Sequence, residues 1–298
     1  MSLALSRITT SCRAFDRKST LNGKLVFIIV FALYFALKLQ SVKQNSAVLG
    51  YNETKRSSGI SESSSLTLCT LVRIDGTQIP YLLVLILGLH HAGFDHVRIY
   101  ILPTDEHLDA LELSGTIKTI NKIVKREDFI TLLNLGTPSK DDFGYKLTDL
   151  ALMYLYDQYA RLPSKCDYIL ITNGDNLYSS FLGSKLKTHL LARKDIVAWD
   201  FISHYERVNL LQADSLEKGT NYEIFDDGTA KCLPISLIPG HFDLGAAVYR
   251  LAFLRHYALQ FRYPDGSYDS WSDGYFMARA SGYTNATVLI RQTLLIHQ

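Results

Sequence analysis

The chain has 298 residues, of which 47% are hydrophobic and 20% are charged, and its formal net charge at pH 7 is +2. This composition is typical of a globular protein with a sizeable core. Much of the positive charge lies in the first 56 residues, and no basic run interleaved with aromatic residues follows it. Nucleic acid is therefore excluded as an expected partner.

The N-terminal part of the chain has the pattern of a membrane anchor. Residues 1–24 are polar and basic, and an apolar run that begins at Leu25 follows them, flanked by Lys24 and Lys38. The run is short for a bilayer, where about 20 residues are usual, but snorkelling lysines extend its effective length. A signal peptide is the main alternative, although no small-residue cleavage site follows. We expect a transmembrane signal anchor at 25–39, with a cytosolic N-terminus because of the preceding Arg and Lys residues.

Residues 40–65 are rich in Ser, Asn, Lys and Glu, which is the composition of a flexible stem. Asn52-Glu-Thr54 in this stem is a glycosylation sequon, and Asn285-Ala-Thr287 is a second one. Both sequons agree with a lumenal location for everything after the anchor. Residues 66–298 are then expected to form one α/β domain.

Four cysteines occur, at positions 12, 69, 166 and 232. None forms a CxxC pair, which speaks against a zinc knuckle or a thioredoxin-type site. Cys12 lies on the other side of the expected anchor, so at most one disulfide forms among the remaining three. The sequence leaves their pairing open.

The first part of the domain has the pattern of a βαβ unit, in which strands at 66–73 and 96–102 flank a helix at 79–92. Such a unit predicts a parallel sheet. Further elements are expected in this order: a helix at 106–115, a strand at 117–124, a helix at 143–159, a strand from 168, a helix at 184–193 and a strand at 196–200. Beyond 201 the pattern is less regular, with a helical or irregular stretch at 204–218, loops at 220–239, strands at 244–250, 287–291 and 294–297, and helices at 251–259 and 275–281.

The strand that begins at Tyr168 breaks abruptly into Asn173-Gly174-Asp175-Asn176, a cluster of turn formers that carries amide oxygens and one carboxylate. In open α/β sheets, ligands bind at the carboxyl ends of the strands. Divalent cations take carboxylate and carbonyl oxygens, and Mn²⁺ also accepts an imidazole. The sequence therefore predicts a metal ligand at Asp175, and an ordinary turn is the alternative interpretation.

Two later residues are candidates for the same site. Asp273 lies at the start of a predicted helix, where it is either a general base or an N-cap. His297 ends the last predicted strand, where it is either a metal ligand or a terminal residue of that strand.

Five further residues are weaker candidates for ligand binding. Arg73 and Asp200 end predicted strands, and Asn173 precedes the metal candidate. Lys146 and Asp149 lie three apart on one helix, where an exposed ion pair is the alternative.

The order of these features resembles the GT-A-fold glycosyltransferases, a nucleotide-sugar-dependent class anchored in the Golgi as type II membrane proteins. In that class a strand ends in Asp-x-Asp, and the last Asp holds a divalent metal against the diphosphate. The corresponding stretch here is Asn173-Gly174-Asp175, so Asn replaces the first Asp. Trp271-Ser-Asp273-Gly resembles the element in which a carboxylate opens a helix after an aromatic residue, and His297 matches a histidine that completes the metal shell.

The resemblance implies a GT-A-like (Rossmann-like), mixed and mainly parallel sheet flanked by helices, behind a single N-terminal transmembrane helix in the Golgi or ER membrane. It implies a metal-dependent transferase that moves a sugar from a nucleotide-sugar donor to a hydroxyl of a glycan, glycoprotein or glycolipid, with inverting chemistry. Mn²⁺ (or Mg²⁺) would be bound by Asp175 and His297, and Asp273 would be the base. Residues expected to contact the nucleotide-sugar are Arg73, Lys146, Asp149, Asn173 and Asp200.

Asn173 keeps an alternative open, namely a catalytically silent GT-A-like domain that binds or scaffolds an active transferase. A nucleotidyltransferase is a third possibility, but the expected anchor and the lack of a Gly-rich phosphate loop after the first strand argue against it.

Overall fold

The computed structural model of the protein describes residues 65–127, 129–161, 166–203, 205–207, 222–224, 230–238 and 241–297. The expected cytosolic tail, the anchor at 25–39 and nearly all of the stem, including the Asn52 sequon, lie outside these residues. Within them, no helix combines the length and the apolar character needed to cross a membrane.

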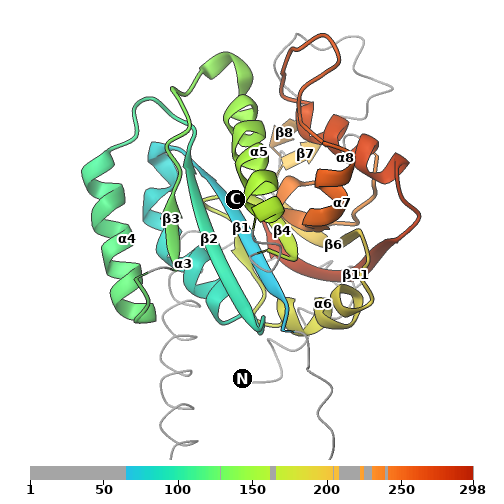
Figure 1. Ribbon diagram of the computed structural model, residues 1–298, viewed down its shortest axis with the longest axis horizontal. Helices are drawn as coiled ribbons and strands as arrows, with labels where there is room; N and C mark the ends of the chain where they lie inside the picture. The colour runs from blue at the N-terminus through green and yellow to red at the C-terminus, as the bar shows by residue number, and fades with distance from the viewer. Residues whose placement is uncertain are drawn as a thin grey trace, which may run out of the picture. The chain divides into compact units, whose positions relative to one another are not determined.

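A mixed sheet of nine strands runs through the described part of the chain, in the order β3-β2-β1-β4-β10-β6-β11-β5, with β9 paired to β6 (Figure 1). β1 to β4 are parallel to one another, and β6 and β11 form a second parallel pair. β10 joins the two groups by antiparallel pairing. The strands are β1 (Thr67–Ile74), β2 (His96–Pro103), β3 (Ile130–Leu132), β4 (Tyr168–Asn173), β5 (Leu177–Tyr178), β6 (Ile196–Ser203), β9 (Lys231–Leu233), β10 (Ala247–Arg250) and β11 (Thr287–Ile296). A separate two-stranded sheet contains β7 (Tyr205–Arg207) and β8 (Tyr222–Ile224).

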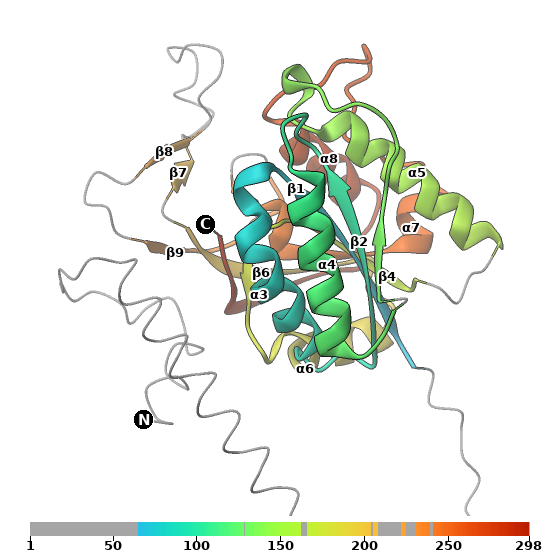
Figure 2. The same ribbon diagram turned by 90° about the vertical axis from the view of Figure 1, so that its left-hand side faces the viewer.

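Helices cover both faces of the sheet. α3 and α4 lie on one face, and α5, α7 and α8 lie on the other, as Figures 1 and 2 show. The helices are α3 (Ile79–His90), α4 (Ala110–Val124), α5 (Tyr145–Arg161), α6 (Leu182–Leu191), α7 (Leu251–His256) and α8 (Ser272–Gly282), and short 3₁₀ turns are η1 (Gly76–Gln78), η2 (Lys140–Asp142) and η5 (Leu244–Ala246). The predicted α/β class, with a mixed sheet between helices, is confirmed.

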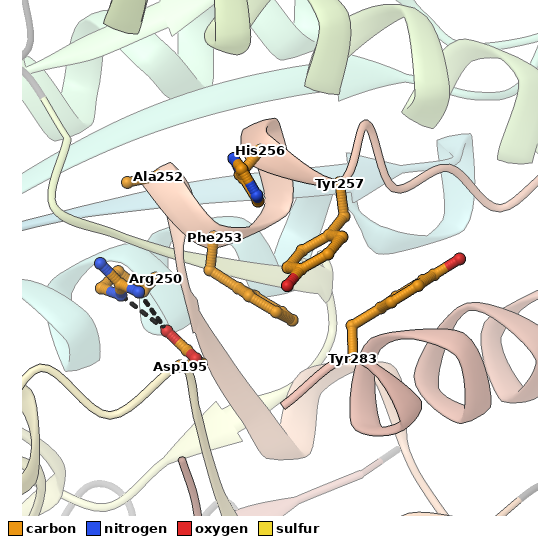
Figure 3. Close-up of a pocket in the computed structure, with 7 residues that line it drawn as sticks. All are labelled: Asp195, Arg250, Ala252, Phe253, His256, Tyr257 and Tyr283. Carbon is orange, nitrogen blue, oxygen red and sulfur yellow. Dashed lines mark hydrogen bonds and ion pairs between the residues drawn. The ribbon is translucent and has the colours of Figure 1, made fainter. Parts of the chain in front are cut away.

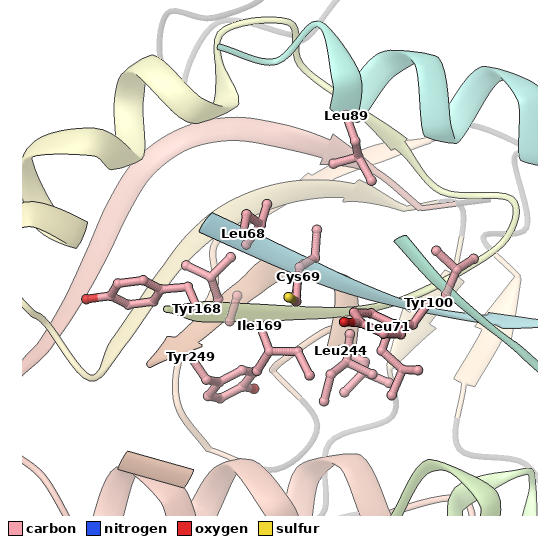
Figure 4. Close-up of a cluster of buried hydrophobic side chains, with 14 of the residues drawn as sticks. Leu68, Cys69, Leu71, Leu89, Tyr100, Tyr168, Ile169, Leu244 and Tyr249 are labelled. Carbon is pink, nitrogen blue, oxygen red and sulfur yellow. The ribbon is translucent and has the colours of Figure 1, made fainter. Parts of the chain in front are cut away.

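The central strands form the core because helices exclude water from both of their faces. Every residue of β1 is buried, and so are the first five of β4. Near-continuous apolar runs of this kind are typical of parallel strands covered on both sides. Figure 4 shows the resulting cluster, in which Leu68, Leu71, Ile169 and Tyr249 are buried.

A disulfide joins Cys69 in β1 to Cys166, just before the neighbouring strand β4, with 5.5 Å between their Cα atoms. The sequence left this pairing open. The bond lies toward the amino ends of the two strands, because Leu68 is opposite Tyr168 in the sheet register. Disulfides persist mainly in oxidising compartments.

One predicted strand is wrong. Residues 117–124, expected to be a strand after a short helix at 106–115, form the second half of the single helix α4. The Asp109 carboxylate caps this helix by accepting hydrogen bonds from two amides of its first turn. Buried Leu113 and Ile120 lie seven residues apart, which is the helical spacing. The β-branched residues of this stretch suggested a strand, but its apolar positions follow the helical period.

Most of the other predicted elements are present with shifted ends. The last two predicted strands are one strand, β11, with irregular pairing between Ile290 and Leu295. β3 was not predicted, because three residues carry little periodic signal. The short strands β7, β8 and β9 lie where the sequence predicts a helical or irregular stretch at 204–218 and loops at 220–239, and most of 204–229 lies outside the described residues.

Candidate functional site

The Asn173-Gly174-Asp175 turn lies at the carboxyl end of β4, where Asn173 is opposite Arg73 of β1 in the sheet register. The Gly174 amide donates a hydrogen bond of 3.2 Å to Gln78 Oε1, which ties the turn to η1. A Cβ on Gly174 would lie 3.2 Å from the Gln78 side chain and 3.3 Å from that of Ile74. Glycine therefore allows this close approach.

The Asp175 side chain is half-buried, and its Oδ1 is fully shielded from solvent without a hydrogen-bond partner. Burial raises its pKa above the ordinary value, and the carboxylates of Asp75 and Asp243 add to this, whereas a hydrogen bond from the backbone amide of Asp175 and the charge of His297 lower the pKa. An unsatisfied buried polar atom costs about 1–3 kcal/mol, and more when it is charged. A cation is the ligand that would remove this cost, so the position has the character of a binding site.

His297 reaches this turn through the pairing of β5 with β11. The two strands are antiparallel, with Leu177 opposite Ile296, so the chain beyond β11 returns to the segment that follows Asp175. The His297 amide donates a hydrogen bond of 2.8 Å to the carbonyl of Ile202, which fixes its backbone. The structure thus brings the two predicted metal ligands into one electrostatic neighbourhood.

Asp243 is a residue of this neighbourhood that the sequence did not suggest. Its Oδ1 accepts a hydrogen bond of 2.8 Å from the Gly245 amide, and its Oδ2 lies 3.2 Å from Nδ1 of His297. A carboxylate that holds the second nitrogen of an imidazole is the usual arrangement around metal-binding histidines. The sequence feature that could have indicated this residue is its place just before Gly245-Ala-Ala247, a run of small residues where the backbone can pack closely.

The close packing at Gly245 involves the other asparagine of the turn. A Cβ on Gly245 would lie 2.8 Å from Asn176 Nδ2 and 2.8 Å from the Tyr178 hydroxyl. Asn176 Nδ2 donates a hydrogen bond of 2.9 Å to Thr172 Oγ1, and the Tyr178 hydroxyl is 2.7 Å from the same oxygen. Asn176 therefore secures the turn from inside the protein.

Asp273 is buried in the first turn of α8, where its Oδ1 accepts a hydrogen bond of 2.7 Å from the Gly274 amide. The N-cap of this helix is Trp271, so the N-cap interpretation of Asp273 is wrong. The positive end of the helix dipole favours the ionised carboxylate. Burial raises the pKa of the Tyr249 hydroxyl well above its ordinary value, and Asp273 and Asp243 both add to the shift. Both carboxylates are therefore close enough to Tyr249 for their charges to act on its hydroxyl.

A row of aromatic rings connects Arg73 with this region. The Arg73 guanidinium lies 4.4 Å from the ring centroid of Tyr145, which stacks on Phe261 at 5.1 Å. Phe261 stacks on Phe276 of α8 at 4.3 Å, and Phe276 meets the Tyr249 ring edge-on at 5.4 Å. Stacked and cation–π pairs of this kind are energetically favourable. The Arg73 guanidinium is therefore packed against the first ring of this row at the carboxyl edge of the sheet.

An exposed ion pair was the alternative interpretation for Asp149 and Lys146, and this is wrong. Lys146 is exposed, whereas Asp149 is buried. The Asp149 carboxylate accepts hydrogen bonds from the amides of Phe261 and Arg262, at 2.7 and 3.1 Å, and from the Tyr268 hydroxyl at 3.1 Å. It therefore holds the loop after α7, including Phe261 of the aromatic row, and its oxygens are not presented to a ligand.

The pKa of Asp149 makes this role testable. Burial raises it from 3.8 to about 6, against the three hydrogen bonds, which lower it. Because the folded-state pKa is the higher one, the folded protein binds more protons between pH ~4 and ~6, and the stabilisation from protonation is lost as the pH rises through this range. The shift corresponds to about 3 kcal/mol.

We expect the free energy of unfolding of the wild type, relative to that of Asp149→Asn, to fall by this order of magnitude between pH ~4 and ~6. Urea denaturation at several pH values measures it, with the exposed Lys146→Gln as the control on the same helix. A difference that does not change with pH would contradict the role given to Asp149.

Asp200 is likewise committed to internal contacts. It is buried and accepts hydrogen bonds from the Ile235 amide at 2.9 Å and from Nη1 of Arg291 at 3.1 Å. The expected contact with a sugar is therefore not supported, because one oxygen of Asp200 already serves two donors from neighbouring segments.

The gathered side chains fit a divalent cation only in part. In the part of the chain that the structure describes, no group of three His, Cys, Asp or Glu side chains is arranged to hold a metal ion. Asp175 offers an unpaired oxygen, and the His297 imidazole is oriented by Asp243. These two residues fit a cation that takes its other ligands from water and from a bound anion.

The sequence matches no protein-family model and no curated protein. Among solved structures, a fragment of S. aureus TarS has a TM-score of 0.50 and 11% identity, covering 77% of this chain and 60% of that one. The same fragment in complex with UDP gives a TM-score of 0.50 and 13% identity. A mannosyltransferase from Pyrobaculum calidifontis, in complex with GDP-Man and Mn²⁺, has a TM-score of 0.47 and 10% identity, covering 91% of this chain and 67% of that one. The chain spans about 60% of the length of the TarS fragment. The two proteins share a GT-A-like α/β fold.

Proposed function

We propose that this protein is a metal-dependent glycosyltransferase, which moves a sugar from a nucleotide-sugar donor to a hydroxyl of a glycan, glycoprotein or glycolipid. The observation that carries the proposal is the shielded, unpaired Oδ1 of Asp175 at the carboxyl edge of the sheet, next to a histidine oriented by Asp243. The similarity in fold to a protein solved in complex with UDP supports it.

Asp175 Oδ1 and the His297 imidazole would hold Mn²⁺ or Mg²⁺. Since Nδ1 of His297 faces Asp243, Nε2 is the nitrogen assigned to the metal. When bound, the cation supplies Lewis-acid stabilisation of the departing diphosphate. Arg73 and Asn173, neighbours in the register of β1 and β4, are assigned to the nucleotide-sugar.

Asp273 is assigned the role of general base. Its carboxylate takes the proton from the acceptor hydroxyl as the hydroxyl oxygen attacks the anomeric carbon, and the bond between that carbon and the diphosphate breaks. Attack from the face opposite the leaving group inverts the anomeric configuration. Its place in the first turn of α8 favours the carboxylate form, because the helix dipole is positive there.

We place this site in the lumen of the Golgi or ER, behind the anchor expected at residues 25–39. The Cys69–Cys166 disulfide supports an oxidising compartment. The membrane is then a partner through this expected anchor.

Calorimetric titration of the full chain with UDP and with GDP, in the presence and absence of Mn²⁺, tests the proposal. We expect one of the two nucleotides to bind, and to bind more tightly with Mn²⁺. Absence of nucleotide binding in all four titrations would overturn it.

The second candidate is a silent domain that binds a nucleotide-sugar without turning it over, and the Asn at position 173 favours it. Release of nucleoside diphosphate from a panel of UDP- and GDP-sugars distinguishes the two. Metal-dependent binding without any release would assign the chain to the silent class.

A further inference from the structure

A cavity of about 320 Å³ lies at the other end of the sheet (Figure 3). It is lined by Asp195 just before β6, by residues from the end of β10 into and just past α7, and by Tyr283 after α8. Arg250 at this cavity is opposite Tyr168, the first residue of β4, whereas Asp175 follows the last. The cavity is therefore at the amino ends of the parallel strands, away from the edge assigned to the nucleotide-sugar.

The charges at the cavity balance each other. Asp195 Oδ1 accepts a hydrogen bond of 2.7 Å from Arg250 Nε and lies 2.5 Å from Arg250 Nη2. The other carboxylate oxygen, Oδ2, accepts a hydrogen bond of 2.6 Å from the Thr284 hydroxyl. The Arg250 side chain is one-third exposed and lines the cavity. An anion would have to compete with Asp195 for Arg250, and a neutral ligand that forms hydrogen bonds is therefore favoured.

The opposite wall is aromatic and preorganised. The rings of Tyr257 and Tyr283 stack at 4.5 Å with an angle of 15° between their planes, although the two residues are 39% and 47% exposed. The buried Phe253 meets the Tyr257 ring edge-on at 5.4 Å, and His256 does so at 4.7 Å. Figure 3 shows the two tyrosine rings lying side by side, on the other side of Phe253 from the Arg250–Asp195 pair.

We propose that this cavity is a carbohydrate-binding site for one neutral sugar residue at the end of a glycan, separate from the proposed donor site. A pyranose has an apolar C–H face, which suits a tyrosine ring, and hydroxyls, which suit Arg250 and His256 as hydrogen-bond partners. Aromatic walls with a few fixed polar groups are typical of small-molecule sites, and the volume is at the lower end of their range.

Two sources could supply this sugar. One is a free glycan, and the other is an N-linked glycan on the protein's own Asn285, which is exposed and lies two residues after Tyr283. The chemistry recognised at the cavity is the same for both, and the experiment separates them.

Saturation-transfer NMR of the full chain with free N-acetylglucosamine, mannose and galactose tests the proposal on protein made without glycosylation. We expect transfer to at least one sugar, which Tyr283→Ala weakens about tenfold and Tyr283→Phe preserves, because only the ring is needed. Tyr81→Ala is the matched control, since Tyr81 on α3 is 46% exposed. Asp175→Ala should also leave the transfer unchanged, which separates this site from the proposed donor site.

Glycosylated protein identifies the source. If the Asn285 glycan fills the cavity, glycosylated wild type fails to bind the free sugar and Asn285→Gln made in the same cells binds it. If the natural ligand is a free glycan, both bind it. The proposal is overturned if the unglycosylated chain shows no transfer to any of the three sugars, if Tyr283→Ala has no effect, or if Asp175→Ala abolishes the transfer.

Discussion

Asp175→Ala is expected to weaken Mn²⁺-dependent nucleotide binding by at least about 100-fold, without loss of stability. Loss of an outer-shell partner already costs about 10–100-fold in metal affinity or activity, and Asp175 is assigned as a direct ligand. The same substitution should make the folded protein more stable. Burial raises the pKa of Asp175, so the ionised carboxylate at neutral pH is unfavourable to the folded state, and its removal should raise the unfolding temperature.

Thermal unfolding and calorimetry on the same preparations measure both effects. Mn²⁺ with nucleotide should raise the unfolding temperature of the wild type and leave that of Asp175→Ala unchanged. Asp95→Ala serves as the control, because Asp95 is an exposed carboxylate before β2, at the amino ends of the strands. A variant that is destabilised and still binds nucleotide with Mn²⁺ would make Asp175 a structural residue of the turn.

Asp273→Asn is expected to lower turnover by about 10²–10⁴-fold, the range that a positioned general base contributes. The amide is nearly the same size as the carboxylate and can still accept the hydrogen bond from Gly274, so the fold should be retained. Nucleotide binding should also be retained, because it is assigned to the edge around Asp175 and Arg73.

The measurement is the rate of diphosphate release with donor and acceptor present, together with nucleotide affinity. Asp265→Asn is the matched control, since Asp265 is an exposed carboxylate in the loop before α8. Near-normal turnover in Asp273→Asn would show that another group accepts the proton. Loss of nucleotide binding in this variant would instead place Asp273 in the donor site.

The sequence predicts those parts of the site that depend on local pattern. A buried strand followed by Asn-Gly-Asp places Asp175 at the carboxyl edge, and the final strand leads to His297. Asp175 and His297 are brought together by the pairing of Leu177 with Ile296. This is a long-range contact, which local sequence patterns do not predict. Asp243 was missed for the same reason, since its contact with His297 depends on how η5 packs beneath the turn.

Sequence patterns are least informative about the hydrogen-bond partners of buried polar side chains. Asp149 and Asp200 occupy positions that suggested ligand contacts, but both bind backbone amides from segments far away in the chain, at Phe261 and Ile235. Helical periodicity located α5 correctly but gave no information on the partners of its buried carboxylate. Propensity failed in α4, where β-branched residues suggested a strand although their spacing was helical.

The Cys69–Cys166 disulfide has a consequence for the unfolded chain. The two cysteines are 97 residues apart, and the segment between them contains α3, β2, α4, β3 and α5. Closing a loop of this length reduces the entropy of the unfolded state, which corresponds to about 4–5 kcal/mol of stability in the chain-entropy description. The bond is at the amino ends of the strands and the Asp175 turn is at their carboxyl ends. Oxidation of this pair therefore restricts the unfolded ensemble of the segment between the two cysteines, and the bond does so from the end of the strands opposite the proposed donor site.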